Sequence, residues 1–307
     1  MSLNFEILID DYFINHTLDQ TLTPIERKRV LSLINDFEDG KWRFANFHEF
    51  IWDNIMETSL SQNERQCLIG RGYSALRAAA KNLRLTDKKN DIGKGSELAE
   101  IVLYGIMKHK YNALPVVPKI FYKQNSQDNA KGADSVHIVI EPAGDFSLWF
   151  GEAKFYNSIE DARLNEIIDS VGNSLDTNKL RKENSIIVNT RDLDDLIKDP
   201  VLLSSIKEAL SNKISIDCLK PKINVPILLL HECKVTSKSN KMTDAYREKI
   251  KQFHKDRATS FFKKQLERIG GLNDYAKISF HLILFPVPEK KAIIETFIKK
   301  VKQFKEE

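Results

Sequence analysis

In the stretch Lys131–Tyr156, KGADSVHIVIEPAGDFSLWFGEAKFY, Val136, Ile138 and Ile140 alternate with His137 and Val139, and a second apolar run extends from Phe146 to Phe150. Between the two runs, Pro142 to Asp145 supplies residue types that favour tight turns. Two short apolar runs separated by such a turn are typical of a β-hairpin. We therefore predict two neighbouring antiparallel strands here, and we use this hairpin as the starting point for the rest of the fold.

Charged residues stand at the open end of this hairpin. Glu152 and Lys154 are two positions apart, so the alternation of a strand directs both side chains to one face and Ala153 to the other. Asp134 lies at the start of the first strand, and an antiparallel pairing of this length brings it beside Glu152. The sequence thus predicts two carboxylates and an ammonium group around one point.

This combination suits metal-assisted hydrolysis of a phosphodiester. Carboxylates are the hard oxygen ligands that Mg²⁺ or Mn²⁺ prefers, and a nearby lysine orients water or stabilises developing negative charge. The alternative is an ordinary solvated ion pair on a surface hairpin, which is the usual fate of an isolated Glu-x-Lys. The apolar run Leu148 to Phe150 just before these charges favours the functional interpretation.

The order of these motifs resembles that of the PD-(D/E)XK nuclease superfamily, over about residues 94–190. The matching motifs are Gly132-Ala133-Asp134 and Glu152-Ala153-Lys154, with Ala133 in the place of the usual proline. The run from Trp149 to Tyr156 is more specifically similar to the nuclease subunit family of Hachiman antiphage defence systems, HamA. The resemblance implies a restriction-endonuclease-like mixed β-sheet flanked by helices, a Mg²⁺ or Mn²⁺ cofactor, DNA as substrate, and a superfamily 2-type helicase as partner.

A helix is predicted from Ser96 to His109, where apolar residues recur at helical spacing. Glu97 lies at the border of its apolar face and Glu100 further toward the polar side. The resemblance implies that a glutamate of the first helix joins the metal site, and we assign that role to Glu97, with Glu100 as the second choice. The alternative for Glu97 is a first-turn glutamate favoured by the helix dipole.

The composition is that of a globular protein, with 307 residues, 42% hydrophobic and 29% charged. The chain has no apolar run long enough to span a membrane and no segment typical of a signal peptide, so we expect a cytoplasmic protein without membrane contact. The three cysteines, Cys67, Cys218 and Cys233, are widely spaced, which argues against a disulfide framework or a zinc site. We expect them to be buried.

The overall prediction is an α/β (α+β) fold in two regions. Residues 1–90 form a mainly helical region, with a strand at residues 3–9 and a helix that follows Pro24. Residues 91–307 form the nuclease-like domain with basic C-terminal helices, after a polar loop at residues 88–95. Further strands of a mixed sheet are predicted from apolar or β-branched runs at residues 114–122, 185–188, 227–231 and 278–285, with a connector at residues 221–226.

Positive charge is concentrated at the C-terminal end of the sequence. From Lys234 onward there are 18 Lys and Arg residues against 9 Asp and Glu, a net charge of +9, compared with +4 for the whole chain. This asymmetry fits a polyanionic partner. A helix from Asp244 to Arg268 carries Lys251, Lys255 and Arg257, which we predict to contact DNA. Alternatively, this face is merely solvated or docks an acidic partner.

Three functions are compatible with these patterns. The first is a metal-dependent deoxyribonuclease that acts, with a helicase, as the effector of an antiphage defence system. The second is a site-specific restriction or repair endonuclease, which would cut at defined positions. The third is a catalytically silent scaffold that binds DNA and leaves it intact with or without Mg²⁺. The sequence favours the first, with Asp134, Glu152, Lys154 and Glu97 as its catalytic residues.

Overall fold

The fold was analysed in a computed structural model of the chain. It describes all residues except 1–2, 18, 20, 86–95, 123–131 and 307. The predicted polar loop at residues 88–95 and the first hairpin residue, Lys131, therefore lie outside the described residues.

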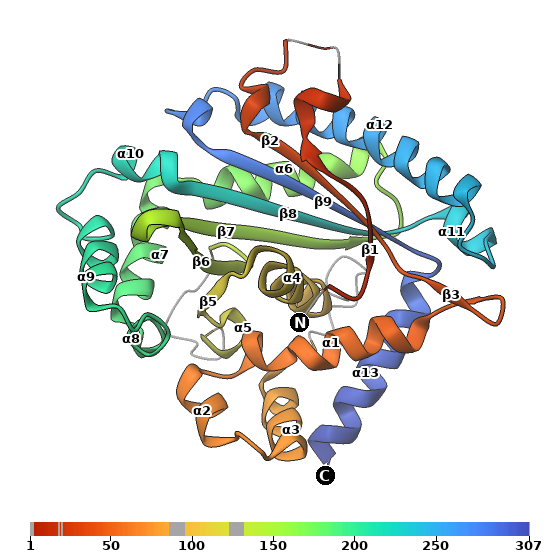
Figure 1. Ribbon diagram of the computed structural model, residues 1–307, viewed down its shortest axis with the longest axis horizontal. Helices are drawn as coiled ribbons and strands as arrows, with labels where there is room; N and C mark the ends of the chain where they lie inside the picture. Colours follow the sequence, from red (N-terminus) through yellow and green to blue (C-terminus); the bar gives the residue numbers. More distant parts are fainter. Residues whose placement is uncertain (1–2, 18, 20, 86–95, 123–131, 307) are drawn as a thin grey trace.

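The centre of the fold is a seven-stranded mixed sheet with the strand order β1-β2-β9-β8-β7-β6-β5 (Figure 1). Strands β2, β9, β8 and β7 run parallel to one another, whereas β1, β6 and β5 pair antiparallel at the two sides. The strands are β1 Glu6–Tyr12, β2 Lys28–Ile34, β5 Leu114–Val117, β6 Ser135–Glu141, β7 Asp145–Tyr156, β8 Ile223–Glu232 and β9 Ser279–Val287. A separate pair is formed by β3 Phe37–Glu38 and β4 Lys41–Trp42. The predicted mixed α/β fold is confirmed.

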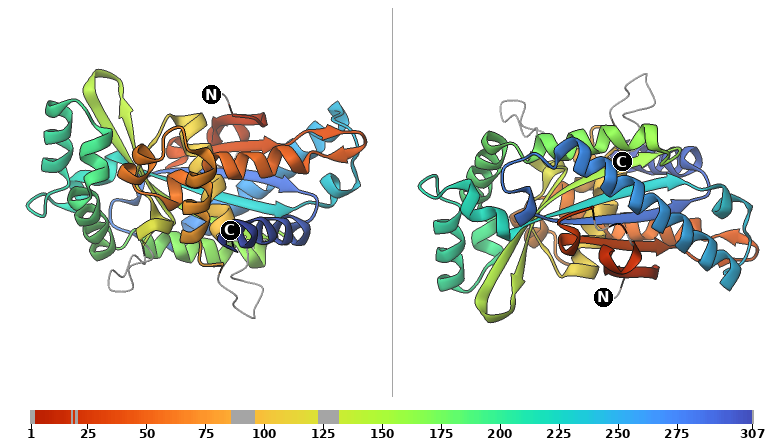
Figure 2. Two further views of the ribbon diagram at one scale, coloured as in Figure 1. Left: turned by 90° about the horizontal axis from the view of Figure 1, so that it is seen from below. Right: turned by 90° about the horizontal axis from the view of Figure 1, so that it is seen from above.

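Helices cover both faces of the sheet, as the two views of Figure 2 show. One hydrophobic core lies between the sheet and the helices α6 Asp161–Ser174, α7 Thr177–Asn189 and α12 Asp244–Ile269. The second core lies on the other face, under α1 Phe44–Ser59, α4 Ser96–Tyr111 and α13 Lys290–Glu306. The remaining helices are α2 Gln62–Cys67, α3 Gly72–Asn82, α5 Lys119–Tyr122, α8 Arg191–Leu196, α9 Pro200–Ala209, α10 Ile216–Leu219 and α11 Lys234–Lys238.

The helix predicted after Pro24 is wrong. A short 3-10 turn, Ile25–Arg27, is followed directly by β2, and nearly every side chain of that strand is buried. Because β2 lies between β1 and β9 with helices on both faces, it has no exposed side and no period-two pattern. Its run of apolar residues matched helical spacing by coincidence. The sheet therefore takes strands from both of the predicted regions, before and after residue 90.

Three further sequence interpretations need correction. The β-branched run at residues 185–188 is part of helix α7, not a strand. The predicted connector at residues 221–226 already contains the start of β8 at Ile223, and Pro226 pairs in register with His281. The strand predicted at residues 114–122 ends at Val117, because Pro118 stops it and α5 follows. Pro115 is tolerated because β5 is an edge strand of the sheet.

Ser61 caps α2, with Glu64 returning its carboxylate to the backbone N–H of Ser61 as a capping box. Helix α12 begins at Asp244, as expected, and continues to Ile269. The expectation that all three cysteines are buried holds for Cys233 only, since Cys67 and Cys218 are exposed on the surface. Their helices, α2 and α10, are short elements that leave these positions in solvent.

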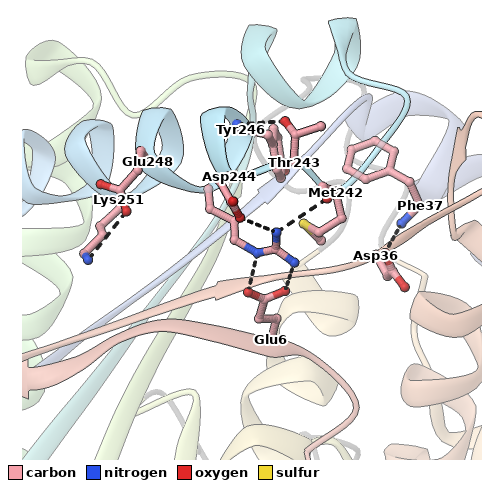
Figure 3. A network of polar contacts seen from close by, with 10 residues as sticks. Glu6, Asp36, Phe37, Met242, Thr243, Asp244, Tyr246, Glu248 and Lys251 are labelled. Carbon is pink, nitrogen blue, oxygen red and sulfur yellow. Dashed lines mark hydrogen bonds and ion pairs between the residues drawn. The ribbon is translucent and has the colours of Figure 1, made fainter.

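Helix α12 is held against the N-terminal edge of the sheet by an arginine (Figure 3). The Arg247 guanidinium donates to both carboxylate oxygens of Glu6 on β1, at 2.7 and 3.1 Å. The same group donates to Asp244 and to the carbonyl of Met242. A two-point arginine–carboxylate contact fixes orientation as well as distance. Arg247 therefore joins the long basic helix to β1.

A chain of buried hydrogen bonds links α12 to the middle of the sheet. The His231 ring on β8 contacts the His254 ring on α12, with 3.1 Å between their Nε2 atoms, and His254 Nδ1 lies 2.6 Å from the Ser32 hydroxyl of β2. His231 Nδ1 lies 3.2 Å from the carbonyl of Glu232 and must donate to it. We assign the donors accordingly: the His254 Nε2–H donates to His231, and the Ser32 hydroxyl donates to His254. Every contact is satisfied with both imidazoles neutral.

Candidate active site

The hairpin places Asp134 opposite Glu152, as the sequence predicts. In the β6–β7 register, Ser135 pairs with Gly151, so the next position on each strand is Asp134 and Glu152. The Asp134 N–H continues the ladder by donating to the Gly151 carbonyl at 2.8 Å. In return, the Ala153 N–H donates to Asp134 Oδ2 at 3.2 Å. The Asp134 carboxylate is therefore fixed by the backbone of the neighbouring strand.

Lys154 completes the group. Its ammonium lies 3.3 Å from Asp134 Oδ2 and 3.7 Å from Glu152 Oε2. Ala153 between them faces the opposite core, as strand alternation requires. Glu152 is almost completely buried, at 2% exposure, whereas the side chains of Lys154 and Asp134 keep 24% and 18% of their surface. The group thus opens to solvent on the side of Asp134 and Lys154.

The cluster of Asp134, Glu152 and Lys154 carries more acidic groups than its single lysine can neutralise. Burial, the neighbouring Asp134 charge and a hydrogen bond between the two carboxyl groups raise the pKa of Glu152 to about 8, although Lys154 and Ser170 oppose the rise. Burial would lower the pKa of Lys154, but Asp134 and Glu152 outweigh it and raise that pKa above its usual value. Two carboxylates against one ammonium, with one carboxylate buried, form a donor set that a divalent cation would neutralise. The residues present fit Mg²⁺ or Mn²⁺.

Sequence reasoning missed one member of this site, Ser170. Its hydroxyl donates to Glu152 Oε2 at 2.7 Å from helix α6, which packs on the same face of the sheet. Ser170 adjoins Val171, which points into the core, so the helical pattern of α6 already placed it at the border of the buried side. Nothing in the sequence around Ser170 indicated its partner, because the two residues belong to different elements.

The first-helix glutamates lie differently from the prediction. The Glu97 carboxylate accepts hydrogen bonds from the backbone N–H groups of Arg84 and Leu85, at 2.8 and 3.0 Å. It therefore holds the segment that follows α3. Glu100 is buried, at 4% exposure, one turn before Leu103, whose side chain packs beside Gly151. Within the described residues, no group of three metal-binding side chains forms. The structure therefore brings together Asp134, Glu152 and Lys154, and gives Glu97 a different contact.

The predicted DNA-binding residues on α12 differ in their surroundings. Arg257 is committed to the fold, because it donates to Asp161 at the start of α6 at 2.8 Å. Lys251 makes a long ion pair of 3.8 Å with Glu248 of the same helix (Figure 3). Lys255 lies one turn further along and, like Lys251, acts electrostatically on His16 next to β1. Lys251 and Lys255 therefore stay candidates for phosphate contacts, and Arg257 acts first as a link between helices.

The family of the chain follows from a match to a family model. The HamA model matches residues 10–301, nearly the whole sequence. The chain belongs to the HamA family. This assignment makes it a protein related to Hachiman antiphage defence. No curated protein matches the sequence. In the described part of the chain, no helix combines the length and hydrophobicity needed to cross a bilayer.

Proposed function

We propose that this protein is a metal-dependent DNA endonuclease that acts in the cytoplasm as the effector of an antiphage defence system. The observation that carries the proposal is the arrangement of Asp134, Glu152 and Lys154 on one face of the hairpin, with both carboxylates within 4 Å of the same ammonium. The order of these motifs on a mixed sheet between helices is consistent with the PD-(D/E)XK superfamily. Such a group suits the hydrolysis of a phosphodiester.

Each residue has a separate role in this proposal. Asp134 and Glu152 supply oxygen ligands, and their placement is set by the Ala153 N–H and the Ser170 hydroxyl. Lys154, which stays protonated because its pKa is raised, orients the attacking water and stabilises the negative charge that develops on the phosphate. A Mg²⁺ or Mn²⁺ ion held by the carboxylates would polarise the phosphate and lower the pKa of a bound water. The deep burial of Glu152 strengthens these interactions.

The defence role and the partner are proposed from the family. The HamA assignment supports a function in Hachiman defence. We extend it to a partnership with a superfamily 2-type helicase, which would sense foreign DNA and deliver it to this site. Lys251 and Lys255 on α12, both half-buried, offer charges for the phosphate backbone or for an acidic face of that helicase.

The proposal is tested by incubating supercoiled and linear DNA with the purified chain, with Mg²⁺, Mn²⁺ or EDTA, and with or without the helicase subunit. We expect cleavage that needs the metal ion and is lost in EDTA. The Lys154→Ala variant should lose about 10²-fold or more in rate while remaining folded, because it removes one positioned charge from a developing oxyanion. Lys299→Ala, which alters an exposed lysine of α13, is the matched control and should cut at the wild-type rate.

The outcomes separate the three functions. Degradation of the DNA into fragments without defined cut sites supports the effector role. A few products with defined ends would instead indicate a site-specific restriction or repair endonuclease. Intact DNA in every condition, together with tight DNA binding, would show a non-catalytic scaffold. Full activity in folded Lys154→Ala would refute the assignment of the site. The Asp134→Ala and Glu152→Ala variants should each reduce cleavage through loss of the metal ion, and their effects should not multiply, because both serve one site.

A further inference from the structure

A completely buried ion pair lies beside the Gly-x-Asp motif. The Lys119 ammonium at the start of α5 contacts both carboxylate oxygens of Glu183 on α7, at 2.5 and 2.7 Å. The side chains of Lys119 and Glu183 are 0% and 4% exposed. The backbone N–H of Lys119 donates to the hydroxyl of Tyr104 on α4, and that hydroxyl donates to the Val117 carbonyl at 2.6 Å. The pair is therefore held from three elements at once.

The carboxylate of this pair touches the backbone of Gly132. A Cβ atom added at Gly132 would lie only 1.8 Å from Glu183 Oε1, well inside the contact limit. Glu183 has a flexible side chain and would normally give way. Here Lys119 holds both of its oxygens, so moving the carboxylate breaks a buried ion pair. Residue 132 must therefore lack a side chain as long as the pair is intact.

Stability alone does not explain the pair. Removing two charges from water costs several kcal/mol per ion, and replacing a buried pair by apolar residues of similar volume is often neutral or stabilising. What the pair adds here is a fixed position for the chain at Gly132. Asp134, whose carboxylate accepts the Ala153 N–H, lies two residues further along. Asp134 is thus fixed on one side by strand β7 and on the other by the contact of Glu183 with Gly132.

We propose that Lys119 and Glu183 are positioning residues for the candidate metal ligand Asp134. This inference rests on the proposed function, because it gives the pair a role in metal binding. The Glu183 carboxylate fixes the position of the backbone at Gly132, and the ion pair with Lys119 fixes that carboxylate. Together the two residues set the distance between the carboxylates of Asp134 and Glu152. Residues that orient metal ligands in this way commonly change metal affinity by about 10- to 100-fold when they are altered.

The test uses the double variant Lys119→Met/Glu183→Gln in the full-length protein. Both replacements keep the approximate size of the side chain and remove both charges together, so no buried charge is left unpaired. Mn²⁺ binding is measured by electron paramagnetic resonance in the absence of DNA. We expect affinity to fall about 10- to 100-fold, with the fold retained by circular dichroism. Gly132→Ala should weaken Mn²⁺ binding as well, because the added methyl group displaces the Glu183 carboxylate.

Two controls separate positioning from general destabilisation. Lys28→Met removes another completely buried lysine, at the N-terminal end of β2, whose ammonium donates to the Leu22 carbonyl. It should lower the unfolding temperature and leave Mn²⁺ affinity unchanged. Gly72→Ala adds a methyl group where nothing lies within 4 Å, and it should change neither quantity.

A second measurement needs no metal. Amide hydrogen exchange at Ala153 reports the hydrogen bond to Asp134, so displacement of Asp134 should speed exchange there about tenfold while distant strands keep their protection. Faster exchange throughout the fold would mean that the pair is only structural. Unchanged exchange at Ala153 with unchanged Mn²⁺ affinity would overturn the inference. If the wild-type protein binds no Mn²⁺, the proposed nuclease function fails, and Ala153 exchange still decides the positioning role.

Discussion

The buried chain of Ser32, His254 and His231 predicts a steep loss of stability in acid. Burial holds the pKa of His231 at about 4 and lowers that of His254 well below its usual value. In the unfolded chain both imidazoles take up a proton near pH 6.5. The folded state thus has its full stability above this pH and loses it as the pH falls toward the folded pKa values.

The size of this loss follows from proton linkage. For each imidazole that stays neutral in the folded state, lowering the pH from 7 to 5.5 reduces the free energy of unfolding by roughly 1.3 kcal/mol. For His231 and His254 together the expected loss is about 2.5 kcal/mol, a large part of the 5–15 kcal/mol that holds most domains folded. Protonation also places a second donor between the two Nε2 atoms, which are 3.1 Å apart, and breaks the chain of hydrogen bonds.

The assay compares urea unfolding of the wild-type protein and of the double variant His231→Gln/His254→Gln at these two pH values. We expect the variant to be less stable at pH 7 but to lose about 2.5 kcal/mol less on acidification. Other titrating groups, Glu152 among them, are the same in both proteins and cancel in the difference. Tyr246→Phe, which removes a buried hydroxyl from the same helix, should lose stability equally at both pH values. An equal acid loss in the double variant and the wild-type protein would refute the reasoning.

Three further predictions concern one or two side chains each. Glu152→Gln should raise the unfolding temperature in EDTA at pH 8. Between pH 4.5 and about 8 the carboxyl group ionises in the unfolded chain but stays protonated in the fold, so stability falls over this range; the gain should vanish below pH 4.5, and a variant less stable at pH 8 would contradict it. Ser32→Ala should cost about 1–3 kcal/mol in urea unfolding, since it leaves a buried ring nitrogen without its donor. Reversing Lys251 and Lys255 to Glu should weaken DNA binding equally for all sequences and flatten its salt dependence, whereas loss of helicase binding at constant DNA affinity would show a protein-docking surface.

The candidate site was predictable because it depends on one local element. Strand alternation puts Glu152 and Lys154 on one face, and a hairpin with a short turn leaves almost no freedom in where Asp134 lies. The contacts of Glu97 were not predictable in this way, because its partners are the backbone N–H groups of Arg84 and Leu85, which follow the end of helix α3.

Other elements were hidden because their decisive contacts are distant in the sequence. Strand β2 carries apolar residues on both faces, so the pattern alone does not separate it from a helix. The run at residues 185–188 has high strand propensity, yet it forms part of α7, where Ile187 packs into the core. Lys119 and Glu183 are 64 positions apart, and only the assembled fold shows that they form a pair.

The position of β2 between β1 and β9 also has a consequence for how the chain folds. Arg27 at the entrance to β2 donates to the carbonyl of Lys277, 250 positions away, and the two strands pair in parallel from there. Contacts of such high sequence separation must close a very large loop before they contribute any stability, which slows folding. During synthesis, β1 and β2 emerge first, but β9, the other neighbour of β2, is made only when nearly the entire chain has been synthesised. The first strands to be made are therefore among the last to be locked into the sheet.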